Sequence, residues 1–413
     1  LGVSVNDSYH FAFMVACASL VLSIAIYYAC RPWFKHVENS AKQVAATGGA
    51  KVEELTPEQT KKRIVALCLV FAVVIFFWMA FHQNGLTLTY FANEFVQPLC
   101  TGVQTMWFDI INLVMIVAIV YAGFSLVQSK EKKTKAISGV VILAALGVLA
   151  YKYLNISAEG ITLSAPIFQQ FNPFYVVALT PFSMALFGAL AKKGKEPSAP
   201  RKIAYGMLVA AIGFAIMAVG SQGLNTPNDQ ARAIAVNKAE TIAKDMNNAA
   251  DDAARKAAEK AKSDFEGKLT KENKEVFETV YNASMVTMSA DSDQAQVAAA
   301  NAELEAIKAD TKEETRTSPY WLIFTYLILT FAELLLSPMG ISFVSKVAPP
   351  KLKGLMMGGW FVATAIGNML VAVGGFLWAG IPLWSVWAVF ISLCLLSALF
   401  MFIMMKRLES VTK

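Results

Sequence analysis

The feature that most limits what this chain can fold into is a series of long apolar segments. A helix needs roughly 20 mostly apolar residues to cross the hydrocarbon core of a membrane. Segments of this kind recur nine times in the 413 residues, at 9–30, 64–91, 106–128, 136–154, 168–191, 203–222, 320–347, 355–379 and 383–405. They are too long and too uniformly apolar for barrel strands, so they predict an all-α integral membrane protein.

Composition supports this prediction. Hydrophobic residues make up 56% of the chain and charged residues 16%, against about 25% charged residues in soluble proteins. The charges lie in short tracts and in one long insert, which excludes an ordinary soluble domain. The five cysteines are scattered without the spacing of metal ligands, so we interpret them as small apolar residues and expect no metal site.

Charge alternates between the short loops. Every second loop is basic, and since basic loops stay on the cytoplasmic side, the C-terminus is expected inside and the first residue outside. The net charge of +6 is explained by these loops, so we expect no nucleic-acid partner. An odd number of spans that starts outside favours a preceding part of the protein. The basic loops lie at 31–63, 130–135, 192–202 and 346–353.

The insert at 223–318 differs from the rest. It is rich in Ala, Lys, Glu and Asp and poor in aromatic residues, which favours a soluble helical subdomain on the outer side. It is either a solvated addition or a docking surface for an extracytoplasmic partner. The expected organisation is a first span (1–35), a cytoplasmic linker (36–63), spans with an additional hairpin at 106–154 (64–222), the insert (223–318), and three last spans with a cytoplasmic tail (319–413).

An ionisable residue stands inside one apolar segment. Glu333 lies mid-helix, in the run FAELLLSPMG at 331–340, with no basic neighbour one turn away. Buried charge in a membrane is costly, so Glu333 is either satisfied by another helix or binds a cation or a proton. Pro338 and Gly340 would loosen the helix beyond it and allow close approach of a neighbour.

Three further positions combine polarity or an aromatic ring with an apolar setting. His82, in FHQNG at 81–85, is either hydrogen-bonded filler or a proton carrier that titrates near physiological pH. Asn172, before Pro173, is either a helix cap or a donor and acceptor for a peptide-like amide. Trp360 lies several residues inside its span, which favours a place in the bundle over one in an interfacial belt.

Enzymatic motifs are missing from the sequence. It contains no His-Glu-x-x-His, no Gly-x-Ser-x-Gly and no phosphate-binding Gly-rich loop with Lys-Ser/Thr. Without an ATP-binding part, an ion gradient is the natural energy source. We therefore expect a secondary transporter without catalytic residues or a cofactor.

Several of these runs resemble the proton-dependent oligopeptide transporter family of the major facilitator superfamily. ELLLSPMG at 333–340 and KGLMMGGWFVATAIGN at 353–368 look like its helices ten and eleven. FQQFNPF at 168–174 resembles the start of helix eight, FHQNGLTL at 81–88 the helix seven motif, and YHFAF at 9–13 the start of helix six. The resemblance leaves out the insert and the hairpin at 106–154.

The resemblance implies a twelve-helix bundle in a bacterial inner membrane that imports di- and tripeptides with protons. By the same resemblance, Glu333 binds the peptide amino terminus, Asn172 binds its backbone, and Trp360 and Ser337 line the pocket. Proton coupling falls to His82 and Glu333, although the family has Glu where His82 stands. Helices one to five of the family have no counterpart here, and this chain alone would then be an incomplete transporter.

Two other functions remain open. A transporter of another small nutrient, such as nitrate or a sugar, could use the same fold, but Glu333 together with Asn172 favours a substrate that bears an amine. A non-transporting scaffold or sensor would instead act through the insert at 223–318.

Overall fold

The computed structural model describes residues 5–46, 55–289 and 292–411. They form two compact units, 1–60 and 61–413, which are considered separately. In the first unit, α1 (Val5–Ala46) contains the apolar segment Phe13–Trp33. The helix continues past residue 35 into the expected linker, of which residues 47–54 lie outside the described part.

The second unit contains the remaining helices and one small sheet. Within the part of the chain that the structure describes, nine helices in total are long and apolar enough to cross a membrane, which confirms the expected all-α membrane fold. The apolar segments of the second unit are formed by the following helices: α2 (Pro57–Phe81), η1 (His82–Gly85), α3 (Thr87–Glu94), α4 (Ile110–Gln128), α5 (Lys132–Leu154), α6 (Phe171–Lys192), α7 (Ala199–Gly220), α12 (Tyr320–Val347), α13 (Lys353–Leu370), α14 (Ala372–Gly380) and α15 (Leu383–Ser410).

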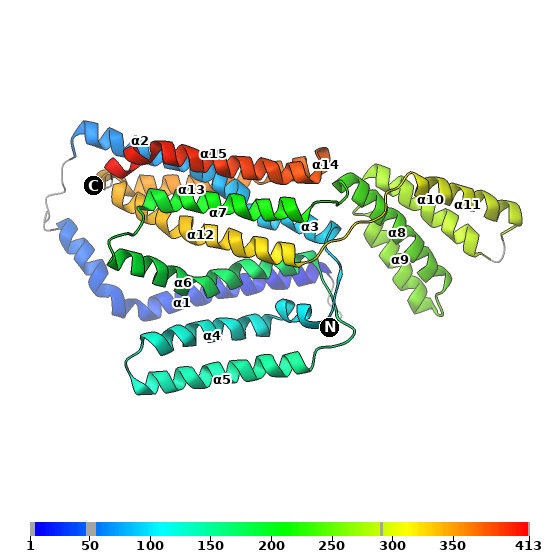
Figure 1. The fold of residues 1–413 in the computed structure, drawn as a ribbon, viewed down its shortest axis with the longest axis horizontal. Helices are drawn as coiled ribbons and strands as arrows, with labels where there is room; N and C mark the ends of the chain where they lie inside the picture. Colours follow the sequence, from blue (N-terminus) through cyan, green and yellow to red (C-terminus); the bar gives the residue numbers. More distant parts are fainter. Residues whose placement is uncertain (1–4, 47–54, 290–291, 412–413) are drawn as a thin grey trace. The chain divides into compact units, whose positions relative to one another are not determined.

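The bundle is centred on α7, which packs against both α12 and α15 (Figure 1). Small residues allow this close packing: a Cβ at Gly206 would lie 3.0 Å from the main-chain oxygen of Ala332, and one at Gly213 would lie 3.0 Å from Leu329. Close backbone approach at small residues is the usual basis of helix association in membranes.

Two of the expected spans are interrupted. The segment expected at 64–91 is divided by η1, and the segment at 355–379 changes from α13 to α14 at Val371. The Gln83 side chain joins the two breaks, since its Nε2 donates to the main-chain oxygen of Met79 at 3.1 Å and of Val371 at 3.0 Å. Discontinuous helices of this kind need side chains to satisfy the freed carbonyls.

The additional hairpin consists of α4 and α5, which pack on each other, and α4 also contacts α6. The polar ends of the hairpin are tied by a two-stranded antiparallel sheet, in which Leu99 of β1 (Leu99–Cys100) pairs with Thr162 of β2 (Ile161–Thr162). Short 3-10 helices continue each strand, η2 (Gly102–Phe108) before α4 and η3 (Ala165–Gln170) before α6, and a third, η4 (Pro350–Leu352), precedes α13.

The insert forms four helices, as its composition predicts: α8 (Pro227–Asn247), α9 (Asp252–Glu266), α10 (Lys271–Met288) and α11 (Gln294–Ala309). Each begins at a side chain that caps it, namely Thr226, Asp251, Thr270 and Asp293. The helices enclose a core of their own, in which Phe277 and Val280 of α10 are fully buried with Ala239 of α8. The insert is therefore a packed subdomain rather than a loose loop.

Candidate substrate-binding site

Glu333 and Asn172 meet inside the bundle. Glu333 lies in the middle of α12, and Asn172 lies in the first turn of α6, after the η3 turn and before Pro173. Asn172 Nδ2 donates to Glu333 Oε2 at 3.1 Å and to Thr330 Oγ1 at 3.1 Å. The packing of α6 on α12 thus brings together two of the residues that the sequence singled out, 161 positions apart.

The carboxylate of Glu333 accepts a hydrogen bond from Asn172 but forms no ion pair with a described basic residue. Among the described residues, no basic side chain forms an ion pair with it, and its recorded polar partner is Asn172. Asn172 uses both N–H groups of its amide on Glu333 and Thr330, so its amide oxygen is the atom it can present to a ligand. A half-buried carboxylate beside an amide oxygen is suited to binding an ammonium group.

Trp360 and Ser337 lie further along the same region. Trp360 of α13 is 2% exposed, and its ring lies over Gly340, where an added Cβ would be 1.9 Å from the indole. The ring also meets Phe71 edge-on at 6.4 Å. Ser337 is half-buried one turn after Glu333. In this conformation Trp360 therefore closes the contact between α12 and α13, and its predicted role in lining the pocket stays a prediction.

His82 lies at the break between α2 and α3. Its Nδ1 is 3.0 Å from the main-chain oxygen of Trp78, and the ring packs against the rings of Trp78 and Phe81. Two positions later the main-chain oxygen of Asn84 accepts a 2.8 Å hydrogen bond from Tyr326 Oη of α12. The break that carries His82 is thereby connected to the helix that carries Glu333, although no direct contact joins the two side chains.

Two side chains of this region, Thr330 and Tyr326, were missed in the sequence, and so was the contact that Gln83 makes. Thr330 is three residues before Glu333, so helical spacing could have placed it on the same face. Tyr326 is seven residues before Glu333 and follows the same spacing. Gln83 is next to His82, but its contact with Val371 depends on the packing of α13 and could not be inferred from spacing.

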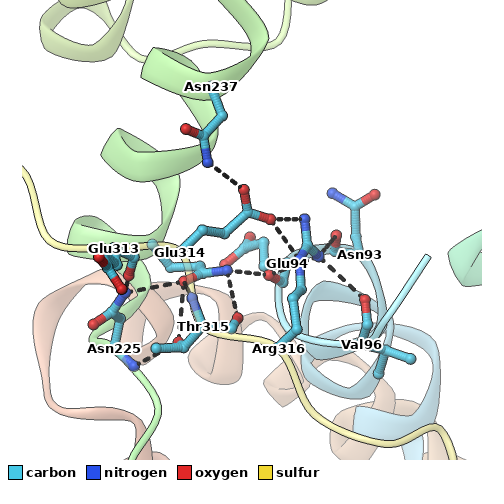
Figure 2. Close-up of polar contacts among 10 residues, drawn as sticks. Asn93, Glu94, Val96, Asn225, Asn237, Glu313, Glu314, Thr315 and Arg316 are labelled. Carbon is cyan, nitrogen blue, oxygen red and sulfur yellow. Dashed lines mark hydrogen bonds and ion pairs between the residues drawn. The ribbon is translucent and has the colours of Figure 1, made fainter. Parts of the chain in front are cut away.

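A second polar cluster joins the insert to the bundle. We call it the insert root: Asn225, Gln230, Thr315 and Arg316, with the main chain of 93–97. Figure 2 shows Arg316 directed at the end of α3, where its Nη1 donates to the main-chain oxygens of Glu94 at 3.0 Å and Val96 at 3.2 Å. Arg316 also pairs with Glu314, which in turn accepts from Asn237 of α8.

Gln230 is the centre of the insert root. It is fully buried, its Nε2 donates to the main-chain oxygens of Glu94 at 2.7 Å and Thr315 at 2.9 Å, and its Oε1 accepts from the main-chain nitrogen of Thr315 at 3.0 Å. Beside it, Thr317 forms a parallel bridge with Val96. The Glu94 carboxylate accepts from Trp378 Nε1 of α14 at 2.9 Å. Asn228 Nδ2 of α8 donates to the main-chain oxygen of Ala379 of α14 at 3.0 Å. The insert is therefore fastened to the ends of both α3 and α14.

The fold and this site define a multi-pass helical membrane protein with a ligand-type carboxylate inside the bundle. A model of the POT family matches residues 144–240 and 283–376. This match confirms the resemblance to that family that was noted in the sequence. The matched ranges include the end of the additional hairpin and parts of the insert.

Named relatives agree with this assignment. The peptide transporter YePEPT of Yersinia enterocolitica is 41% identical over 58 residues, 14% of this chain and 11% of that protein. The dipeptide and tripeptide permease B of Salmonella typhimurium is 24% identical over 227 residues, 51% of this chain and 40% of that protein. The chain thus spans less than half the length of these relatives.

Among solved structures, one of a POT family transporter in complex with a thioalcohol-conjugated peptide is 13% identical, with a TM-score of 0.47. That comparison covers 100% of this chain and 56% of the other.

Proposed function

We propose that this protein is part of a secondary transporter that imports di- and tripeptides together with protons. The observation that carries the proposal is the Glu333 carboxylate, held by Asn172 in the bundle interior without a described cationic partner. The amino terminus of a peptide supplies the missing positive charge, and the amide oxygen of Asn172 is a partner for its N–H groups. The match to the POT family model and the similarity to a relative named as a dipeptide and tripeptide permease support this substrate class.

A proton gradient would drive this transport, with His82 and Glu333 as the proton-responsive groups and no cofactor. His82 supports the assignment because it lies at a helix break and its one recorded main-chain bond is at Nδ1. A group that titrates at such a break can favour one conformation over another.

The experiment that tests the substrate assignment is Glu333→Gln. The amide keeps the shape of the side chain but not its charge, so we expect binding of a dipeptide to fall at least tenfold, as for loss of a charge-assisted hydrogen bond of about 1.5–3 kcal/mol. Uptake of a labelled dipeptide by cells that express the complete transporter should be lost, and binding to the purified transporter should weaken. Glu333→Asp should retain part of both.

The control is Glu275→Gln, an exposed glutamate of α10 in the insert, which should leave uptake and binding unchanged. Equal surface expression of the variants is checked by surface labelling. Undiminished uptake and binding in Glu333→Gln would remove Glu333 from the site and with it the case for an amine-bearing substrate.

We also propose that the C-terminus faces the cytoplasm and the insert faces the outside. The basic loops at 130–135 and 192–202 support this orientation, because such loops stay inside. In a variant without native cysteines, Ser263→Cys in α9 should react with a membrane-impermeant maleimide in intact cells. Ser410→Cys at the end of α15 should react only after permeabilisation, and the reverse pattern would invert the topology.

A further inference from the structure

A polar cavity lies at one end of the additional hairpin, away from the Glu333 site. It has a volume of about 350 Å³, and it is lined by residues of η2, of the first turn of α4, of the last turn of α5 and of the segment that follows. Its polar side chains include Asp109, Asn112, Lys152 and Asn155. The proposed peptide site does not include these residues. They nevertheless place an acidic and a basic side chain in the same cavity.

The two charges form a close pair. Asp109 caps α4, where its Oδ1 accepts from the main-chain nitrogen of Ile111 at 2.8 Å, and its Oδ2 accepts from Lys152 Nζ at 2.6 Å. The hydrogen bond from Lys152 holds the pKa of the Asp109 carboxyl below its usual range. Lys152 has two further N–H groups, because an ammonium group carries three donors and one is used on Asp109. The pair can therefore bind one more anionic and one more cationic group.

Asn112 adds a buried acceptor that lacks a donor. The residue is 2% exposed, and its Nδ2 donates to the main-chain oxygen of Met106 at 3.0 Å. Its Oδ1 receives no hydrogen bond from any described residue. Native proteins rarely leave such an atom unpaired, and the exceptions call for a ligand or another explanation. Because this oxygen is buried, an N–H donor in the cavity, which Asn112 lines, reaches it when the amide turns toward the cavity.

The surroundings are those of a membrane interface. Tyr151 and Tyr153, at the same end of α5, are 66% and 54% exposed, as aromatic side chains at the headgroup level are. The first turns of α4 also line an apolar cavity of about 300 Å³ against α6, with Ile110 and Leu113 on one side and Phe174 on the other. The polar cavity and the apolar cavity thus meet at the start of α4. This arrangement suits a lipid, which has a polar headgroup and apolar acyl chains.

We propose that this cavity binds the headgroup of a phospholipid that carries a primary ammonium group. Lys152 contacts the phosphate, and the ammonium group lies between Asp109 and the oxygen of Asn112. The acyl chains enter the apolar cavity between α4 and α6. A purely anionic headgroup leaves Asp109 facing a like charge. A quaternary ammonium group has no N–H to donate to Asn112, so phosphatidylcholine satisfies the charges but not this acceptor.

The test compares three lipids on the purified chain. Native mass spectrometry with phosphatidylethanolamine, phosphatidylcholine and phosphatidylglycerol of identical acyl chains gives their relative affinities. We expect phosphatidylethanolamine to bind about tenfold more tightly than the other two, the ratio for one added hydrogen bond to a charged donor. Asn112→Leu and Asp109→Asn should each remove most of this preference, and Asn caps a helix as well as Asp does, which keeps α4 intact. Lys152→Met should weaken phosphatidylethanolamine and phosphatidylcholine alike.

The matched control is Lys132→Met, an exposed lysine at the other end of the same hairpin, which should change nothing. Equal binding of the three lipids, or a preference that survives both Asn112→Leu and Asp109→Asn, would overturn the proposal. Glycerophosphoethanolamine, which has the headgroup without the acyl chains, separates a lipid from a soluble ligand. It should compete only weakly, and competition as strong as that of the intact lipid would also overturn the proposal.

Discussion

The insert root and the Glu333 site are both polar clusters at helix contacts, but they are built differently. At the root, Gln230 and Arg316 bond to main-chain oxygens on the facing segment, and the charge of Arg316 is balanced by Glu314. At the Glu333 site, one amide holds a carboxylate that has no described cation. We infer from this difference that the root is a structural joint. It also supports the proposal that the Glu333 site binds a positively charged ligand or a proton.

The largest effect is expected when Gln230, the centre of the insert root, is replaced, and this substitution tests directly whether the root is only structural. Gln230→Ala leaves the main-chain oxygen of Glu94 and the main-chain nitrogen of Thr315 without their partner. Each unsatisfied buried group costs about 1–3 kcal/mol, so we expect the free energy of unfolding to fall by about 3–5 kcal/mol. Thermal unfolding in detergent measures the loss, and hydrogen exchange locates it to 93–97 and the start of α8.

The control for this change is Gln294→Ala, an exposed residue in the first turn of α11, for which we expect less than about 0.5 kcal/mol. Dipeptide uptake per folded molecule should survive Gln230→Ala. If the protein stays folded and uptake is lost, the root takes part in transport and the division between joint and site is wrong.

A medium effect is expected at His82, which belongs to neither cluster. Gln can donate to the main-chain oxygen of Trp78 as His can, but it does not titrate. His82→Gln should therefore leave peptide counterflow intact and reduce pH-driven accumulation about tenfold, the bias that corresponds to one pKa unit. His82→Glu, which restores the residue of the family pattern, should retain part of the coupling.

The measurement is accumulation of a labelled dipeptide in proteoliposomes with and without a pH gradient. His10→Gln, an exposed histidine of α1, serves as the control. Unchanged accumulation in His82→Gln would mean that His82 is structural and that protons travel through Glu333 or another group.

The spans and part of the candidate site were predictable from the sequence, because both depend on the difference in polarity between a residue or segment and its neighbours in the chain. A carboxylate such as Glu333 stands out inside an apolar run, and so does Asn172 at the start of one. Their hydrogen bond could not be predicted, since it depends on how α6 packs against α12. The break at His82–Gly85 was missed because hydropathy, averaged over 64–91, does not register one turn of polar residues.

The insert root could not have been found by the same reasoning. Gln230 and Arg316 are polar residues in a polar segment, so nothing in composition separates them from their solvated neighbours. What distinguishes Gln230 is its burial, and what distinguishes Arg316 is its hydrogen bonds to the end of α3; both are properties of the tertiary structure. The helical character of the insert was predictable from its helix formers and caps, but its attachment was not.

The smallest expected effect is at the edge of the root, where Asp229 pairs with Lys312 at 2.7 Å. Hydrogen bonds from Lys312 and Thr226 hold the pKa of Asp229 below its usual range. The pair therefore stabilises the fold above the ordinary Asp pKa of about 3.9, and this contribution is lost as the pH falls through the lower pKa of the folded state. Because Lys312 is 63% exposed, solvent screening limits the contribution to about 0.5 kcal/mol or less.

Asp229→Asn should thus lower the free energy of unfolding slightly at pH 7 and have no effect in acid, below both pKa values. Thermal unfolding at the two pH values measures the change, and a double-mutant cycle with Lys312→Met isolates the pair itself. Asp245→Asn, an exposed aspartate of α8 with no recorded ion pair, is the matched control. The free energy of unfolding should fall far less in Asp229→Asn than in Gln230→Ala. An equal fall in the two variants would show that ion pairs, and not the buried hydrogen bonds to the main chain, stabilise the root.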